Sequence, residues 1–185
     1  QKDKIKKIIN KNNIDSIIHL AANLIISEGE KKPNKYYKNN VIGTKKLLSA
    51  CQNTFIKNFI FSSTAAVYKD GQYKVNENSI IKPQSVYGKT KIQGEKLIKS
   101  FCKKNKINYG ILRYFNIAGS SPSGKIGLLN KSDNLFKNYS KQIMKKKPTL
   151  KIYGGDYNTK DGSCIRDFIH VSDIAEIHYK VLNQI

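Results

Sequence analysis

The sequence of 185 residues has no tryptophan, a single methionine and few acidic residues, and its three cysteines stand far apart. Three widely spaced cysteines form neither a CxxC metal pair nor a disulfide framework, which favours a reducing, cytoplasmic compartment. No run approaches the roughly 18 consecutive apolar residues that a membrane-spanning helix needs. The polar opening Gln1-Lys2-Asp3-Lys4 is unlike a signal peptide. These features predict a cytoplasmic protein without a membrane partner.

Basic residues outnumber acidic ones by 34 to 13, which gives a formal net charge of +21. Such a charge suits a protein that binds nucleic acid. However, only Arg113 and Arg166 are arginines, whereas proteins that read nucleic acids rely on arginine for bidentate contacts. The abundance of Lys, Asn and Ile, which have A/T-rich codons, points instead to a biased genome with lysines on solvated faces. We therefore expect no nucleic-acid partner, with a non-catalytic basic binding module as the alternative.

The apolar pattern predicts helices alternating with strands, and 39% hydrophobic residues suffice for a real core. Helices are predicted over 2–12, 33–54, 85–105, 135–147 and 172–184, and strands over 14–22, 57–62, 108–114 and 150–153. The strands are too apolar to have one solvated face, so the fold class is a doubly wound parallel α/β sheet. After residue 116 the texture changes, which predicts a second, smaller region over 117–185.

The sequence also predicts the buried face of one helix and the N-cap of another. In the helix over 33–54, apolar residues recur at steps of three and four and predict its buried face: Tyr37, Val41, Thr44, Leu48 and Cys51. Ser85 is a plausible N-cap of the helix over 85–105.

Tyr87 and Lys91 are the first candidates for chemistry. At positions i and i+4 of a predicted helix they share one face. A tyrosine with a pKa of about 10 is a poor base at neutral pH, but a nearby ammonium favours the tyrosinate and lowers this pKa. The pair can therefore take a proton from a substrate hydroxyl. The spacing alone is a weak signal, because chance pairs are expected in a chain rich in both residues.

The hydroxyl-bearing residues Ser62, Ser63 and Thr64 strengthen this interpretation. They end a predicted buried strand, at the carboxyl edge where doubly wound sheets bind ligands. There the Thr64 hydroxyl and the Tyr87 phenol can converge on one substrate oxygen. The alternative is that the three hydroxyls only cap or turn the chain. The constellation as a whole favours catalysis.

Six segments resemble a known family: HLAA (19–22), KPNKYYKNNVIGT (32–44), FIFSSTAAVY (59–68), PQSVYGKTK (83–91), LRYFNIAG (112–119) and IYGGDYNTKDGSCIRDFIHVSDIA (152–175). Together they resemble the extended short-chain dehydrogenase/reductases, and within them the UDP-glucose 4-epimerases, over nearly the whole chain. The resemblance implies a partial Rossmann-like NAD-binding domain over 1–116. It also implies a partial UDP-sugar-binding region over 117–185, interleaved with the end of the first domain.

The resemblance also implies an activity, the reversible epimerisation at C4 of UDP-glucose and UDP-galactose by hydride transfer to tightly bound NAD. Tyr87 would be the base, Thr64 would assist at the same hydroxyl, and Lys91 would bind the nicotinamide ribose and lower the pKa of Tyr87. The residues implied to bind NAD are Ala21, Ala22, Asn39, Ser62, Ser63, Tyr87, Lys91 and Phe115. Those implied to bind the UDP-sugar are Thr64, Asn116, Asn134, Leu135, Lys151, Ile152, Tyr153 and Arg166.

Several of these residues have structural alternatives. Asn39 can satisfy backbone groups, Phe115 can belong to the core, and Tyr153 can be a packing aromatic. A guanidinium suits phosphate oxygens, which makes Arg166 the expected diphosphate partner; a structural pair with Asp167 or Asp173 is the alternative. His19 is expected to be structural, and no constellation of metal ligands is found.

The sequence also departs from the family pattern. It has no glycine-rich phosphate-binding turn before a helix. Leu24 stands where the family often has a lysine that reaches the cofactor, and Lys69 follows Val67-Tyr68 where glycine is usual. We therefore expect an internal piece of a longer chain that on its own binds NAD poorly and is inactive.

The nearest enzymatic rivals are other nucleotide-sugar 4-epimerases and the 4,6-dehydratases. Dehydratases of the family carry Asp-Glu directly after the catalytic threonine, whereas Ala65 and Ala66 stand there in this chain. Without these carboxylates elimination has no evident proton carrier, which favours epimerisation. The resemblance further implies a homodimer that pairs the helices over 33–54 and 85–105.

Overall fold

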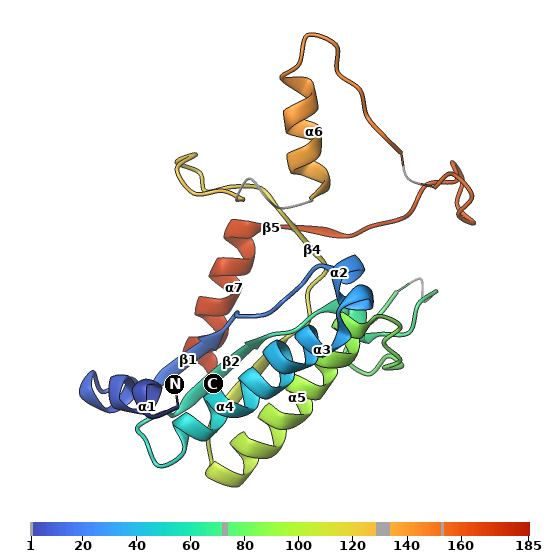
Figure 1. The fold of residues 1–185 in the computed structure, drawn as a ribbon. Helices are drawn as coiled ribbons and strands as arrows, with labels where there is room; N and C mark the ends of the chain where they lie inside the picture. The colour runs from blue at the N-terminus through green and yellow to red at the C-terminus, as the bar shows by residue number, and fades with distance from the viewer. Residues whose placement is uncertain (1, 72–73, 129–133, 153) are drawn as a thin grey trace. The chain divides into compact units, whose positions relative to one another are not determined.

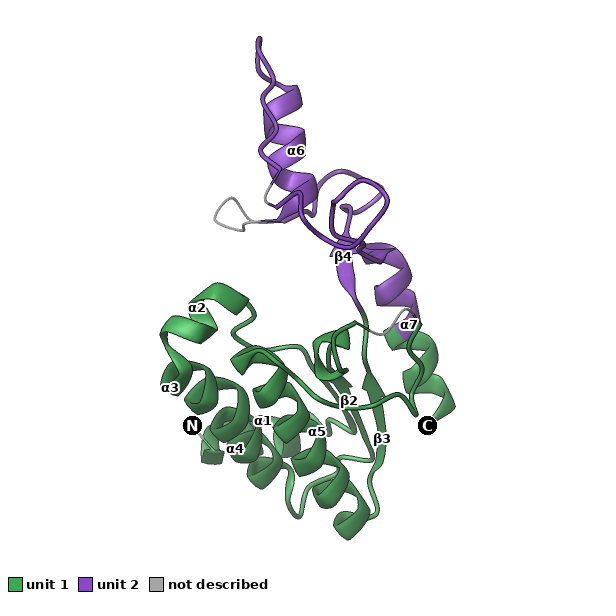
Figure 2. Cartoon of the chain, turned by 90° about the vertical axis from the view of Figure 1, so that its right-hand side faces the viewer, with its two compact units in different colours: residues 1–114, 178–185 green, residues 115–177 purple. Residues whose placement is uncertain are grey.

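The computed structural model describes residues 2–71, 74–128, 134–152 and 154–185 (Figure 1). The chain divides into two compact units, one of residues 1–114 with 178–185 and one of residues 115–177 (Figure 2). Within the described ranges, no helix has both the length and the apolar character that crossing a membrane requires.

Unit 1 contains a parallel three-stranded sheet in the order β1-β2-β3, formed by Ser16–His19, Asn58–Ser62 and Asn108–Leu112. In its register His19 lies opposite Phe61, and Phe61 lies opposite Ile111. The carboxyl ends of the three strands therefore meet at one edge, and the predicted parallel α/β fold class is confirmed. β1 is shorter than predicted, because residues 20–25 leave the sheet.

Helices connect these strands in sequence order. α1 (Lys2–Lys11) precedes β1, and α5 (Val86–Asn105) links β2 to β3. The connection from β1 to β2 holds α2 (Ile26–Lys31), α3 (Pro33–Tyr36), the π-helix η1 (Tyr37–Ile42) and α4 (Gly43–Cys51). α4 and α5 lie side by side over the sheet (Figure 1). α5 begins at the predicted N-cap, since the Ser85 hydroxyl accepts a hydrogen bond from the Gly88 amide at 3.0 Å.

The π-helix corrects one predicted residue of the buried face. The predicted continuous helix over 33–54 is broken into α3, η1 and α4, and Tyr36 is fully buried whereas Tyr37 is 47% exposed. A π turn bonds each residue to the fifth along the chain and so holds one residue more than an α turn. The stripe set by Val41 and Thr44 therefore continues backwards to Tyr36 rather than to Tyr37.

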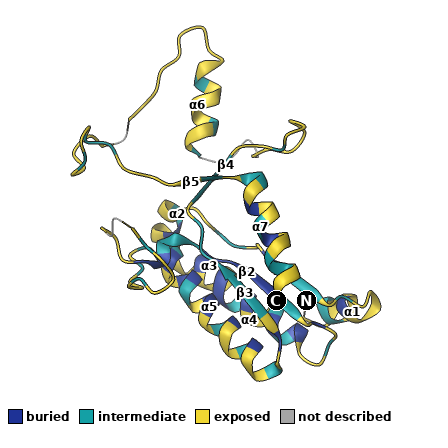
Figure 3. Ribbon diagram, turned by 180° about the vertical axis from the view of Figure 1, so that it is seen from behind, coloured by how far each residue is buried: buried dark blue, intermediate teal, exposed yellow. Residues whose placement is uncertain are grey.

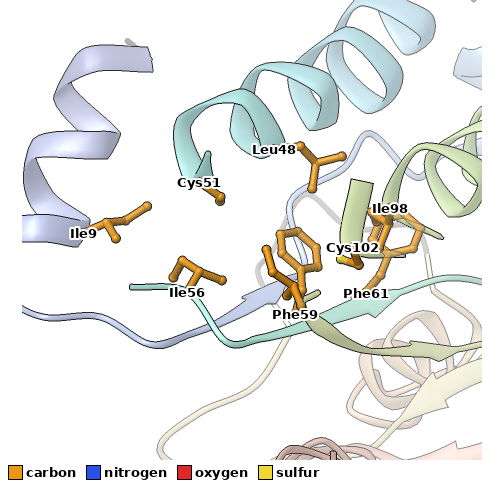
Figure 4. Close-up of a cluster of buried hydrophobic side chains, with 9 residues drawn as sticks. Ile9, Leu48, Cys51, Ile56, Phe59, Phe61, Ile98 and Cys102 are labelled. Carbon is orange, nitrogen blue, oxygen red and sulfur yellow. The ribbon is translucent and has the colours of Figure 1, made fainter. Parts of the chain in front are cut away.

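The core of unit 1 lies between the sheet and the helices α1, α4 and α5 (Figure 4). Phe59 and Phe61 point to this side because alternate strand residues face the same way. The buried members of the cluster are Ile9, Leu48, Cys51, Ile56, Phe59, Phe61, Ile98, Cys102 and Ile107. On the opposite face Gly110 leaves room for Val181, whose side chain would lie 2.7 Å from an added Cβ. The buried residues are concentrated on the sheet and the inner sides of its helices (Figure 3).

Unit 2 contains a second parallel pair, β4 (Asn116–Ala118) with β5 (Phe168–His170), and the helix α6 (Leu135–Ile143). The last helix, α7 (Val171–Gln184), begins in unit 2 and ends in unit 1. The predicted strand over 150–153 is wrong, since residues 150–152 have no regular structure. β4 and β5 were not predicted, because strands of three residues are too short to show a period.

Candidate active site

The last residue of β2 and the two residues after it carry hydroxyl groups at the carboxyl edge of the sheet. The Ser62 hydroxyl hydrogen-bonds to the Tyr114 phenol, and the Ser63 amide donates to the Leu112 carbonyl at 2.8 Å. Both serines are buried, whereas Thr64 is half-buried. The Thr64 side chain caps the short helix η2 (Ala65–Val67), whose Ala66 amide lies 3.1 Å from its oxygen. Capping is thus one of the roles that these hydroxyls have in the fold.

The start of α5 packs directly on η2. Gly88 makes this approach possible, because an added Cβ would clash with the Ala66 carbonyl oxygen and lie 3.0 Å from Pro83. The first amide of the helix, that of Val86, donates to the Glu30 carboxylate at 2.8 Å. The close packing places Tyr87 near Thr64, and the Thr64 hydroxyl acts on the pKa of the phenol.

We expect Gly88→Ala to separate α5 from η2. Overpacking costs about 1–3 kcal/mol, and a catalytic group displaced by about 1 Å can cost a hundred-fold in rate. Urea unfolding measures the loss of stability, and the turnover rate of the gene product measures the displacement of the catalytic group. Gly43→Ala is the matched control, because its new Cβ meets no atom closer than 3.9 Å. It should keep turnover, and equal losses in both variants would contradict the close-packing argument.

Burial raises the pKa of Tyr87 to about 12, and the nearby Thr64 hydroxyl opposes this shift. The direction is opposite to the one expected from the spacing of Tyr87 and Lys91. Removing the phenolate from water costs more than the Thr64 hydroxyl offsets. The protein part of the site therefore keeps Tyr87 protonated.

Lys91 is 3% exposed, and burial lowers its pKa to about 8 although the nearby Glu95 raises it. Its Nζ lies 4.3 Å from the centroid of the Phe61 ring, a distance at which a desolvated ammonium is attracted to the ring face. Within the described part of the chain, Lys91 donates no hydrogen bond and forms no ion pair. A buried ammonium in this state has donors to offer to a ligand.

His19, at the end of β1, is neutral at pH 7. Its Nε2 lies 2.9 Å from Thr44 Oγ1, and burial together with the charge of Lys91 lowers its pKa to about 4. This agrees with a structural role.

The neutral His19 predicts a loss of stability in acid. As the pH falls below 6.5, His19 becomes protonated in the unfolded chain, whereas in the folded chain it becomes protonated only near pH 4. Acid therefore favours the unfolded state. A gap of this size corresponds to about 3 kcal/mol of unfolding free energy between pH 7 and pH 4. Urea unfolding at both pH values measures it, and His19→Phe should remove this part of the decrease. An equal decrease in the variant would contradict the assignment.

Residues 20–25 follow β1 at the same edge of the sheet and include the predicted cofactor residues Ala21 and Ala22. Asn40 holds this segment, because its side chain bonds the Asn23 amide at 2.8 Å and the Asn23 carbonyl at 2.9 Å. The same amide group donates to Thr90 of α5 at 3.0 Å. The predicted Asn39 is exposed and donates to Asn40 at 3.1 Å. Asn40 was not predicted from the sequence. It lies four residues before Thr44, on the predicted buried face of the helix, and a polar residue at such a position could have indicated it.

The other predicted residues lie in unit 2. Phe115 is 45% exposed, and Asn116 donates from its side chain to the Asp167 carbonyl at 3.0 Å. The Asn134 side chain caps α6 through the amides of Phe136 and Lys137. Leu135, Lys151, Ile152 and Arg166 are exposed. Tyr153 lies outside the described residues.

Unit 2 contains a cavity of about 650 Å³ lined largely by apolar groups of β4, α6 and the start of α7. Asn134 is the predicted ligand residue that lines it, whereas Lys151, Ile152 and Arg166 do not. Neither Asp167 nor Asp173 forms an ion pair with Arg166, so the structural alternative for this arginine is not found among the described residues. The described ranges also hold no group of three His, Cys, Asp or Glu side chains that could bind a metal ion.

Comparison with known proteins places the chain in a family. The model of the NAD dependent epimerase/dehydratase family matches residues 1–185. A UDP-glucose 4-epimerase of Halalkalibacterium halodurans is 40% identical over 174 residues, which cover 93% of this chain and 52% of that protein.

Solved structures agree with the sequence comparison. The UDP-glucose 4-epimerase of Bifidobacterium longum, in complex with NAD+ and UDP, superposes with a TM-score of 0.91 at 32% identity, covering 100% of this chain and 57% of that one. The UDP-glucuronic acid 4-epimerase of Bacillus cereus, in complex with UDP-glucuronic acid and NAD, gives 0.79 at 32% identity, covering 96% and 52%. The chain thus spans about half the length of the relatives it matches. With a parallel α/β sheet and a Tyr-Lys pair at its carboxyl edge, the chain belongs to the NAD dependent epimerase/dehydratase family.

Proposed function

We propose that the gene product containing this chain interconverts UDP-glucose and UDP-galactose by epimerisation at C4, with NAD as cofactor. The observation that carries the proposal is the group formed by Thr64, Tyr87 and Lys91. Two neighbouring hydroxyls and a buried ammonium, which has no acceptor among the described residues, lie together at the carboxyl edge of the sheet.

In this proposal Tyr87 accepts the proton of the sugar 4-hydroxyl and later returns it. Thr64, whose hydroxyl lies near the phenol, donates to or accepts from the same substrate oxygen and so fixes its position. Lys91 is buried with its ammonium charged at neutral pH, and it binds a hydroxyl-bearing part of the cofactor. A second positive charge is required near Tyr87, because the pKa of about 12 leaves little phenolate at neutral pH.

The residues present fit NAD at one end of the molecule. The ammonium of Lys91, without an acceptor among the described residues, suits the two hydroxyls of a ribose. Ala21 is small and exposed beyond the end of β1, and it is proposed to face a flat ring of the cofactor. Ala22, Asn39, Ser62, Ser63 and Phe115 complete the proposed cofactor residues. When bound, NAD supplies the acceptor and donor of a hydride at C4 and the positive charge of its nicotinamide ring.

The UDP-sugar is proposed to contact Thr64 together with residues of 115–177. These are Asn116, Asn134, Leu135, Lys151, Ile152, Tyr153 and Arg166, with Arg166 at the diphosphate. Ala65 and Ala66 form the first turn of η2 and bring no carboxylate to the site. Their identity argues for epimerisation over the elimination of water.

The test is an assay of the purified gene product with NAD and UDP-glucose, followed by nuclear magnetic resonance of the anomeric proton. Formation of UDP-galactose supports the proposal. UDP-glucuronic acid and UDP-N-acetylglucosamine are the competing substrates, and faster conversion of either would move the proposal to another 4-epimerase. A 4-keto-6-deoxy product would instead identify a dehydratase.

We further propose a homodimer that pairs the helices over 33–54 and 85–105 with their copies. Tyr37, turned out of the core by the π-helix, is a half-exposed aromatic on the first of these helices. Sedimentation equilibrium of the gene product tests the assembly.

A further inference from the structure

A buried cluster of charges lies one turn beyond Lys91. Glu95 of α5 is fully buried, and the Arg113 side chain at the end of β3 is 10% exposed. Arg113 donates from Nε to Oε1 of Glu95 at 2.9 Å and from Nη2 to Oε2 at 2.7 Å. Ser63 adds a third hydrogen bond, to Oε1 at 2.5 Å. Both carboxylate oxygens are therefore occupied.

The occupation of Glu95 has a consequence for Lys91. At i and i+4 on α5 the two residues share a face, where a lysine and a glutamate normally pair. Here the ammonium lies on the face of the Phe61 ring instead, 4.3 Å from its centroid. The carboxylate remains close enough to raise the pKa of Lys91, although the two side chains form no ion pair. The charge of Glu95 thus raises the pKa of Lys91, although the Lys91 ammonium donates no hydrogen bond to the carboxylate.

Arg113 is held in place from its other side. Its Nη1 donates to the Tyr68 phenol at 3.3 Å, and its guanidinium lies 5.2 Å from the centroid of the Tyr68 ring. Burial and these partners fix the orientation of the planar guanidinium. A guanidinium can donate to both oxygens of a carboxylate at once, whereas the ammonium of a lysine does not have this geometry. Paired with Glu95, the guanidinium keeps its positive charge, since the pKa of Arg113 is raised above its usual value.

We propose that Arg113 and Glu95 are positioning residues for Lys91: by binding both carboxylate oxygens, Arg113 keeps Glu95 from pairing with Lys91, whose ammonium stays charged and open to a ligand hydroxyl. This inference rests on the proposed function only in giving Lys91 a ligand to bind. The electrostatic arrangement is testable without turnover.

The other ionisable groups around Lys91 do not replace Glu95. His19 from β1 is neutral at pH 7, and Tyr87 of α5 is a protonated phenol. Tyr36 of α3, near Tyr87, is also protonated, since burial raises its pKa. Among the described residues, Glu95 is therefore the negative charge that faces Lys91. By binding the Glu95 carboxylate, Arg113 keeps it from forming an ion pair with the Lys91 ammonium.

The test is the pKa of Lys91, measured in the gene product without added ligand through the 13Cε chemical shift and assigned with Lys91→Arg. We expect Glu95→Gln to lower it by about one unit, because the negative charge that faces Lys91 among the described residues is lost. We expect Arg113→Gln to raise it by a similar amount, because the released carboxylate pairs directly with the ammonium. Glu28→Gln is the matched control, since it breaks the exposed pair of Glu28 with Lys35 and should leave Lys91 unchanged.

Opposite shifts in the two variants support the proposal, whereas no shift, or shifts in the same direction, overturn it. Arg113→Lys keeps the charge and a single contact, and it serves if Arg113→Gln does not fold; it should shift the pKa upwards by less. A merely structural ion pair would change the unfolding free energy in both variants without opposite shifts at Lys91. If the pKa of Lys91 does not shift as expected, the proposed epimerase activity is not contradicted, because that activity is tested separately by conversion of UDP-glucose.

Discussion

Replacing Tyr87 by phenylalanine should lower kcat of the gene product about a thousand-fold, within the range of roughly 10² to 10⁴ that a positioned acid or base supplies. The variant loses only the phenol oxygen, which is the proton acceptor in the proposed reaction. The fold should survive, because the ring stays and a buried phenylalanine needs no hydrogen-bond partner. Conversion of UDP-glucose under saturating substrate measures the effect.

Tyr109→Phe is the control for this experiment. Tyr109 pairs with Phe59 near the beginning of β3, away from the carboxyl edge, and packs against the core. It lies four residues before Arg113 and so repeats the spacing of Tyr87 and Lys91 in a strand. The control should keep turnover. Wild-type turnover in Tyr87→Phe would remove this tyrosine from the mechanism and leave the proposed function without its base.

Much of unit 1 was predictable because its elements are long and strongly patterned. α5 matches its predicted range and begins at its predicted cap, Ser85, whose hydroxyl has an amide to accept from. The π-helix could not be predicted, since an inserted residue leaves the apolar spacing readable in two registers, through Tyr36 or Tyr37. Tertiary packing chose Tyr36, whose phenol reaches the Ile25 carbonyl at 2.6 Å.

The sequence predicts candidate site residues but not their electrostatics. The spacing of Tyr87 and Lys91 and the strand end before Thr64 sufficed to bring the three together in the prediction. The sign of the Tyr87 shift depends on burial, which the sequence does not give. The role of Arg113 also went unnoticed, because its partner Glu95 is distant in sequence and meets it only through the packing of α5 against β3.

Phe61 connects the core to the site, and its truncation should lower the free energy of unfolding strongly. The ring is 2% exposed and packs so closely on α5 that an added Cβ at Gly94 would lie 2.9 Å from it. Truncating a buried phenylalanine to alanine costs about 3–5 kcal/mol. Phe59 is fully buried on the same strand and face, so Phe59→Ala should cost a similar amount in urea unfolding.

The two phenylalanines differ in their relation to Lys91, and leucine variants isolate this difference. Phe61→Leu removes the aromatic face beneath the ammonium, and a desolvated cation–π contact is worth about 2 kcal/mol. The charged form of Lys91 loses that support, so its pKa should fall by about 1.5 units. Phe59→Leu leaves the contact in place and should leave the pKa unchanged. Equal pKa values in the two variants would mean that burial and Glu95 alone set the charge of Lys91, and the ring would then serve the core only.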